Sequence, residues 1–387
     1  MSVEWFDLGQ RLNAADTGHA VPRLLHAPLL PVTRPVAVRA TSTGARVTVA
    51  ATVPGSTPAT AHGPEALTLL ASLGASITAA SPPTLVTDHP ATLGLLYRLA
   101  LTTTPGTPGD DVAALIAWWR DRADFPGGRA VVDTVTACRT RWVTGQTPEH
   151  EAQPGTWRNW LGIGDDTPSG VLRVHELLTA GPPLTFLTTL AEDDLYAYNT
   201  AQSEHGDGFD WRRPDTPSRA ALGLRARCDA ADLYAAALLT DPLYRLRAVH
   251  TGHVLTGTAD PLGDRLKRTR LTCHRLDSRL RPGTAVAGWV GGPETHTSPF
   301  SATVSAAEVE HGLLVLTLSG VTGHAPVAGD RATIHPAAPS PARQRAGRRS
   351  YRALYAARRS WLTTGRTPTP TRRDVPLDVL VAGAEPD

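Results

Sequence analysis

A run of arginines near the C-terminus is the strongest indication of chemistry in this sequence. Residues 337–373 contain ten arginines and no acidic residue. Because the whole chain has a formal charge of only +2, the remaining residues together carry −8. Guanidinium groups pair well with phosphates and carboxylates. The segment is therefore expected to bind an anionic partner.

Arginines and aromatic residues of this segment recur every three to four positions over residues 343–362, which predicts a helix. Its arginines could contact phosphates, and its aromatic rings could stack on bases. The alternatives are an arginine face that docks on an acidic protein surface and a plain solvated face. We predict that nucleic acid is bound by residues of this helix and by two arginines of the segment that precedes it. These residues are Arg268, Arg270, Arg345, Arg348, Arg349, Arg352, Tyr355, Arg358 and Arg359.

An acidic cluster between residues 192 and 215 is a second candidate. Carboxylates with a histidine are what a divalent metal or an acid–base pair requires. The spacing matches no fixed metal motif, and residues 203–214 have the composition of a loop. We therefore predict a solvated acidic loop, with no metal ligand or cofactor assigned, and keep a metal-dependent enzyme as an alternative. The cluster consists of Glu192, Asp193, Asp194, Glu204, His205, Asp207, Asp210 and Asp215.

The common catalytic motifs are missing from the sequence. It contains no phosphate-binding loop with a glycine-lysine pair, no dinucleotide glycine motif after a strand, no His-Glu-x-x-His and no Gly-x-Ser-x-Gly. Cys138, Cys228 and Cys273 lie far apart and form no metal-binding spacing. These absences disfavour the ATPase, dehydrogenase, zinc-protease and common hydrolase classes, and we expect a non-enzymatic protein.

Residues 248–336 are expected to form a small β-barrel next to the arginine segment. Apolar residues there alternate with a period of two, and six short strands fit into about 90 residues, which predicts an antiparallel barrel of the OB or SH3 kind. The turns at 281–286 (Arg-Pro-Gly-Thr-x-Val) and 327–334 (Val-Ala-Gly-Asp-x-x-x-Ile) resemble those of small barrels in translation and nucleic-acid-binding proteins. The first barrel strand is expected over 253–257. His250 and His253 flank Thr251 and Gly252 at this strand, and as strand residues three apart they would point to opposite faces.

The residues before the barrel read as a mixture of helices and strands. A β-hairpin is predicted over 32–53, a strand over 84–87, and helices over 64–72, 91–101, 110–122, 129–143 and 218–239. The predicted class is α+β. Four parts are expected: a mixed module over 1–103, a helical module over 110–247, the barrel over 248–336, and the arginine-rich helix and tail over 343–387.

The sequence shows no membrane signal. The first residues have neither a basic start nor an apolar core, and no apolar run approaches the ~20 residues that a spanning helix needs. Three separated cysteines fit reduced thiols in the cytoplasm. We predict a cytoplasmic, non-enzymatic binding or adaptor protein with DNA or RNA as its partner. A scaffolding component that docks its arginine helix on an acidic protein is the alternative.

Overall fold

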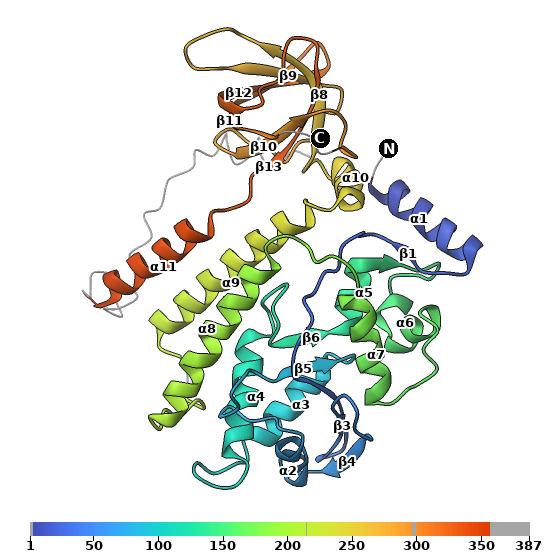
Figure 1. Cartoon of the computed structure of the whole chain (residues 1–387), viewed down its shortest axis with the longest axis vertical. Helices are drawn as coiled ribbons and strands as arrows, with labels where there is room; N and C mark the ends of the chain where they lie inside the picture. The colour runs from blue at the N-terminus through green and yellow to red at the C-terminus, as the bar shows by residue number, and fades with distance from the viewer. Residues whose placement is uncertain (1–2, 214, 296–298, 357–387) are drawn as a thin grey trace, which may run out of the picture. The chain divides into compact units, whose positions relative to one another are not determined.

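The computed structural model describes residues 3–213, 215–295 and 299–356. The chain divides into two compact units: Met1–Pro214 with Arg227–Pro341, and Asp215–Ala226 with Ala342–Asp387. The predicted α+β class is confirmed (Figure 1). The four-part division stays a prediction. None of the helices in the described ranges is long and apolar enough to cross a membrane.

A five-stranded mixed sheet is the centre of the N-terminal part of the first unit. Its strand order is β4-β3-β2-β5-β6, with β2, β5 and β6 parallel and β2, β3 and β4 antiparallel. The predicted hairpin and the predicted strand at 84–87 are both confirmed. The strands are β2 (Pro35–Thr43), β3 (Arg46–Thr52), β4 (Ala59–His62), β5 (Thr84–Thr87) and β6 (Val131–Asp133).

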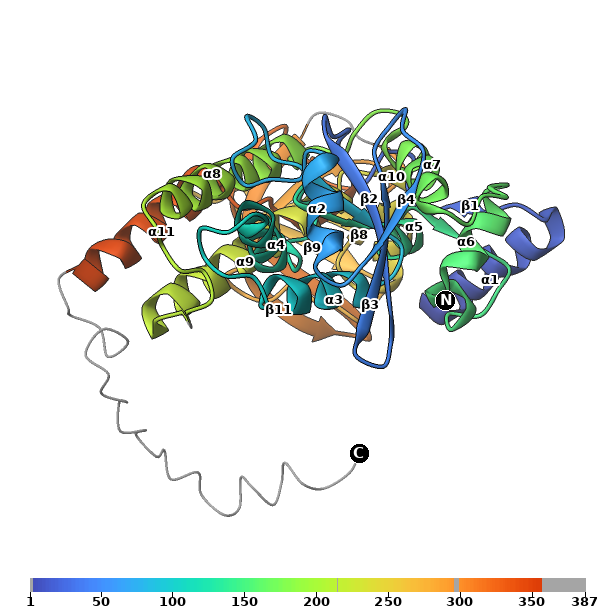
Figure 2. The same cartoon turned by 90° about the horizontal axis from the view of Figure 1, so that it is seen from below.

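Helices cover both faces of this sheet, as the alternation of its buried side chains requires. The first set of helices is α2 (Glu65–Ser72), α3 (Ala91–Ala100) and α4 (Asp110–Arg122), and the second set is α5 (Thr134–Arg141), α6 (Pro154–Trp160) and α7 (Pro168–Thr179). Val36 and Val38 belong to a core with the first set, whereas Ala37 and Val86 belong to a core with the second set. Figures 1 and 2 show the two sets on opposite sides of the sheet.

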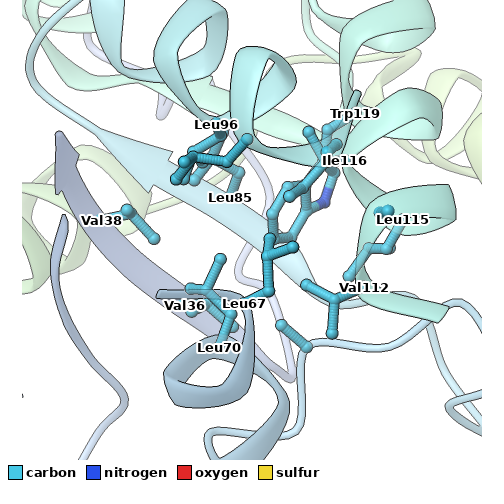
Figure 3. Packing of buried hydrophobic residues seen from close by; sticks show 14 of the residues in the cluster. Val36, Val38, Leu67, Leu70, Leu85, Leu96, Val112, Leu115, Ile116 and Trp119 are labelled. Atoms are coloured by element: carbon cyan, nitrogen blue, oxygen red, sulfur yellow. The ribbon is translucent and has the colours of Figure 1, made fainter. Parts of the chain in front are cut away.

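Tryptophans anchor these two cores. Trp119 is fully buried among Leu67, Val112 and Ile116 (Figure 3), and its indole Nε1 donates to the Pro83 carbonyl at 2.9 Å. In the other core, Trp157 donates to the Glu151 carbonyl at 2.7 Å. The indoles of Trp119 and Trp157 are therefore both hydrogen-bonded, and burial of such a side chain contributes about 3 kcal/mol to folding.

The prediction of one helix over 129–143 is wrong. Val131 and Val132 pair with β5 as strand β6, and the helix α5 begins only at Thr134. Asp133 ends the strand and caps the helix, because its side chain accepts from the amides of Val135 and Thr136. The segment then leaves the helix at Trp142, where the short strand β7 (Trp142–Val143) pairs with β1 (Val21–Pro22).

Residues 154–247, which lie within the expected helical module, form helices. After α6 and α7 the chain continues as α8 (Leu187–Gly206), α9 (Pro217–Leu238) and α10 (Pro242–His250). Asp241 is fully buried and caps α10, and it also accepts from the amides of Leu25 and His26 at 2.8 and 2.9 Å. The N-terminal helix α1 (Val3–Thr17) meets α10 through an ion pair of 2.9 Å between Asp7 and Arg247.

The predicted small antiparallel barrel is also confirmed. Six strands close in the order β10-β11-β12-β9-β8-β13 around a core that includes Leu271, Phe300 and Ile334. Gly288 is required inside this barrel, because an added Cβ would lie 2.4 Å from the Phe300 ring and 2.7 Å from the Ile334 side chain. The strands are β8 (Leu255–Pro261), β9 (Thr269–Cys273), β10 (Ala285–Val290), β11 (Pro299–Glu310), β12 (Leu313–Gly323) and β13 (Arg331–Pro336).

Candidate functional site

The arginine segment forms the helix α11 (Pro341–Ala356), which belongs to the second compact unit from Ala342 onward. It contains five arginines and no acidic residue. Arg345, Arg348, Arg349 and Arg352 stand at positions i, i+3, i+4 and i+7, which share one helix face. Arg345, Arg349 and Arg352 are exposed, and Arg348 is half-buried. We call these four residues the arginine stripe.

Like charges separated by three or four positions repel one another and destabilise a helix by a few tenths of a kcal/mol per pair. The arginine stripe has two pairs four residues apart, Arg345 with Arg349 and Arg348 with Arg352. An anion placed along the stripe would relieve this repulsion. Tyr351 is also exposed, on the same helix. The predicted contact residues Arg358 and Arg359 lie outside the described residues, as does the Tyr355 side chain.

The two predicted barrel arginines are engaged with acids of the barrel itself. Arg268 forms an ion pair with Asp264, and Arg270 pairs with Glu310 across the barrel wall at 2.6 Å. The hydrogen bond from Arg268 is the main cause that lowers the pKa of Asp264. Arg265 and Lys267 on the adjoining loop are exposed. Positive charge in this region is thus partly neutralised, which the sequence did not reveal.

The acidic cluster is divided among separate partners. Asp194 is buried, pairs with Arg122 at 2.5 Å, and also accepts from the Arg129 amide, so it holds the turn between α4 and β6. His205 lies 2.8 Å from Asp111. The predicted loop starts later than expected, since α8 runs to Gly206. Within the described ranges, no three His, Cys, Asp or Glu side chains come together in a way that could hold a metal ion.

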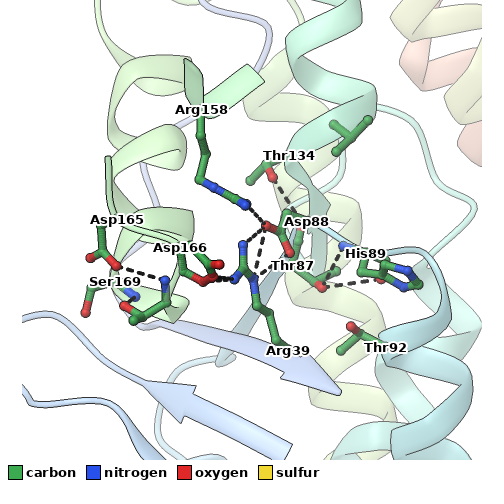
Figure 4. A network of polar contacts seen from close by, with 12 residues as sticks. Arg39, Thr87, Asp88, His89, Thr92, Thr134, Arg158, Asp165, Asp166 and Ser169 are labelled. Carbon is green, nitrogen blue, oxygen red and sulfur yellow. Dashed lines mark hydrogen bonds and ion pairs between the residues drawn. The ribbon is translucent and has the colours of Figure 1, made fainter. Parts of the chain in front are cut away.

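A polar network at the carboxyl ends of β5 and β6 was missed by the sequence analysis (Figure 4). Asp88 follows β5 directly, is 5 % exposed, and accepts from Arg39 Nε at 3.0 Å and from Arg158 Nη1 at 2.7 Å. Arg39 also bonds the exposed Asp166 at 2.8 Å. Such edges of parallel strands often bind ligands. Here, however, both oxygens of Asp88 are occupied by guanidinium groups, and the network joins β2, β5 and α6.

The basic end of α10 is more open. His250 is the last residue of α10 rather than part of a strand, and the predicted strand at His253 begins only at Leu255. His253 instead sits in a turn, where its Nδ1 lies 2.9 Å from the Thr251 hydroxyl. Beside this turn, a hollow of about 850 Å³ is lined by residues that include His250, Arg275, Arg279 and Arg281. We call it the basic hollow.

Comparison with known proteins adds no assignment: no family model, no curated protein and no solved structure matches this chain. The functional argument therefore depends on the geometry of the arginine stripe and of the basic hollow.

Proposed function

We propose that the protein is a non-enzymatic nucleic-acid-binding or adaptor protein of the cytoplasm that holds DNA or RNA by its phosphates. The observation that carries this proposal is the arginine stripe. Its helix α11 has five arginines and no acidic residue, and three of the four stripe residues are exposed. Nucleic-acid phosphates supply a row of negative charges that matches a row of arginines along a helix.

The small barrel supports the same proposal in a secondary way. Barrels of this size often bind oligonucleotides through one face, although the fold alone does not assign a function. Arg265 and Lys267 are exposed on the loop that joins β8 and β9. Arg268 and Arg270, which are already paired with acids, would exchange a carboxylate for a phosphate and so contribute less to affinity.

The test is fluorescence anisotropy of the full chain with short single- and double-stranded DNA and RNA over a series of salt concentrations. Binding that weakens linearly in a double-logarithmic plot of affinity against salt is the expected result, because bound arginines release counterions from phosphates. If none of the four nucleic acids binds at low salt, the proposal is wrong. Recovery of an acidic protein in a stoichiometric, nucleic-acid-free complex would then favour the scaffolding alternative.

A further inference from the structure

The basic hollow is formed where the C-terminal end of α10 meets the connection between β9 and β10. All of its lining residues belong to the first compact unit, and it therefore uses none of the arginines of α11. Three of the lining residues are arginines that lie within seven positions of one another: Arg275, Arg279 and Arg281. The charge and the rigidity of this wall decide what the hollow can bind.

The wall of the hollow has an excess of positive charge. Arg275 is neutralised by Asp277, with Nη2 3.0 Å from the carboxylate, and the same nitrogen donates to the His250 carbonyl at 2.7 Å. Arg279 and Arg281 are exposed, and neither forms an ion pair with any acid in the part of the chain that the structure describes. Burial first, and the charge of Arg279 second, lower the pKa of the neighbouring His253.

The backbone that carries these arginines is fixed on both sides of Arg279. The Arg279 amide donates to the Gly252 carbonyl at 2.9 Å, and the next residue, Leu280, is buried in the barrel core. Gly252 has a φ of +74°, and an added Cβ would lie only 2.9 Å from the Asp277 carbonyl oxygen. The close approach of the turn and the loop thus needs glycine here. A fixed loop reduces the entropy cost of ordering the arginines around a ligand.

We propose that the basic hollow binds the phosphate monoester of a nucleotide-sized ligand. Guanidinium groups match phosphate oxygens with two parallel hydrogen bonds, and two arginines that form no ion pair among the described residues can balance a phosphate dianion. The hollow is open to solvent, and its volume of about 850 Å³ leaves room for a ligand of nucleotide size. His250, whose ring packs on Phe6 with centroids 5.0 Å apart, offers an aromatic surface in the same hollow. The phosphate can belong to a free nucleotide or to the 5′ end of a nucleic-acid strand.

The test measures binding of the full chain to matched probes with and without phosphate. Calorimetry compares AMP with adenosine, and anisotropy compares a 5′-phosphorylated oligonucleotide with its unphosphorylated copy. The variants are Arg279→Gln and Arg281→Gln, with Arg331→Gln as the control, because Arg331 is an exposed arginine that lies next to the opposite end of β10. Each hollow variant is expected to weaken phosphate binding at least tenfold, the loss of one charge-assisted hydrogen-bonding group. The control variant should bind like the unchanged protein.

The outcomes separate the two ligand sources and the two proposals. Preference for AMP over adenosine identifies a free nucleotide as sufficient, whereas preference only for the 5′-phosphorylated strand identifies a nucleic-acid end; either supports the site. If phosphate improves neither probe, or if the hollow variants change binding no more than Arg331→Gln does, the inference is overturned. The double variant Arg345→Gln with Arg349→Gln should leave AMP binding intact, so failure of the arginine stripe is distinguishable from failure of the hollow.

Discussion

Replacing Asp88 by asparagine removes the carboxylate that Arg39 and Arg158 share. The Asp88 side chain is 7 % exposed, and the two arginine side chains are 20 % and 14 % exposed, so water screens these charges weakly. Loss of one partner from a buried pair costs roughly 3–5 kcal/mol, because a charge remains buried without compensation. Asparagine keeps one carbonyl acceptor and Arg39 keeps Asp166. We therefore expect the lower limit, a loss of about 3 kcal/mol, which raises the unfolding constant roughly 100-fold.

Urea unfolding followed by tryptophan fluorescence measures this loss, because Trp119 and Trp157 are buried on opposite faces of the same sheet. Asp166→Asn is the matched control. Asp166 binds the same Arg39, but its side chain is 84 % exposed, and such surface pairs contribute about 0–1 kcal/mol. If Asp88→Asn lowers the free energy of unfolding no more than Asp166→Asn does, the network does not stabilise the fold as its burial indicates.

Three further predictions concern stability. His175 is 5 % exposed, and burial lowers its pKa to about 4. Below pH 6.5 this histidine binds a proton in the unfolded chain but not in the folded chain, so the folded state loses up to about 3 kcal/mol of stability between pH 6.5 and pH 4. His175→Leu should remove this pH-dependent loss, measured by urea unfolding at a series of pH values. Gly288→Ala should destabilise the barrel by about 2 kcal/mol through overpacking, whereas Gly94→Ala, with nothing near its added Cβ, should be neutral or stabilising; equal melting temperatures would contradict this. Asp241→Asn turns an amide group toward one of two pairs of backbone N–H donors, Leu25 with His26 or Leu243 with Tyr244, so one of these pairs should exchange hydrogen at least tenfold faster. Unchanged exchange at all four amides would show that Asp241 holds neither segment.

Patterns confined to one element were sufficient to predict much of the fold. The barrel strands alternate along their own length, and the six strands expected over 248–336 are found. The error at 129–143 has a long-range cause. Val131 and Val135 have helical spacing, but β5 is buried on both faces and needs a second neighbour, which Val131–Asp133 supplies. Asp133 before Thr134 was a local capping signal that could have indicated the true start of the helix.

The same distinction between local patterns and long-range contacts applies to the candidate sites. The composition of α11 is visible in a single segment, so the arginine stripe could be identified without a structure. The basic hollow depends on the loop returning against the end of α10, a contact between residues such as Gly252 and Arg279 that no local pattern encodes. Neutralisation of Arg270 by Glu310, 40 residues away, is hidden in sequence for the same reason. Counting charges along the sequence therefore overestimates the net positive charge of the barrel surface and does not reveal the basic hollow.

The most direct test of the account compares the salt dependence of duplex DNA binding by the full chain with that of the double variant Arg345→Gln and Arg349→Gln. Each arginine that leaves a phosphate should make the logarithmic salt slope shallower by about 0.9, so the double variant should lose about 1.8. A control with Arg46→Gln and Arg98→Gln removes the same charge from exposed positions of β3 and α3. The account predicts an unchanged slope for the control and a shallower slope for the stripe variant; equal slopes in all three proteins would contradict it.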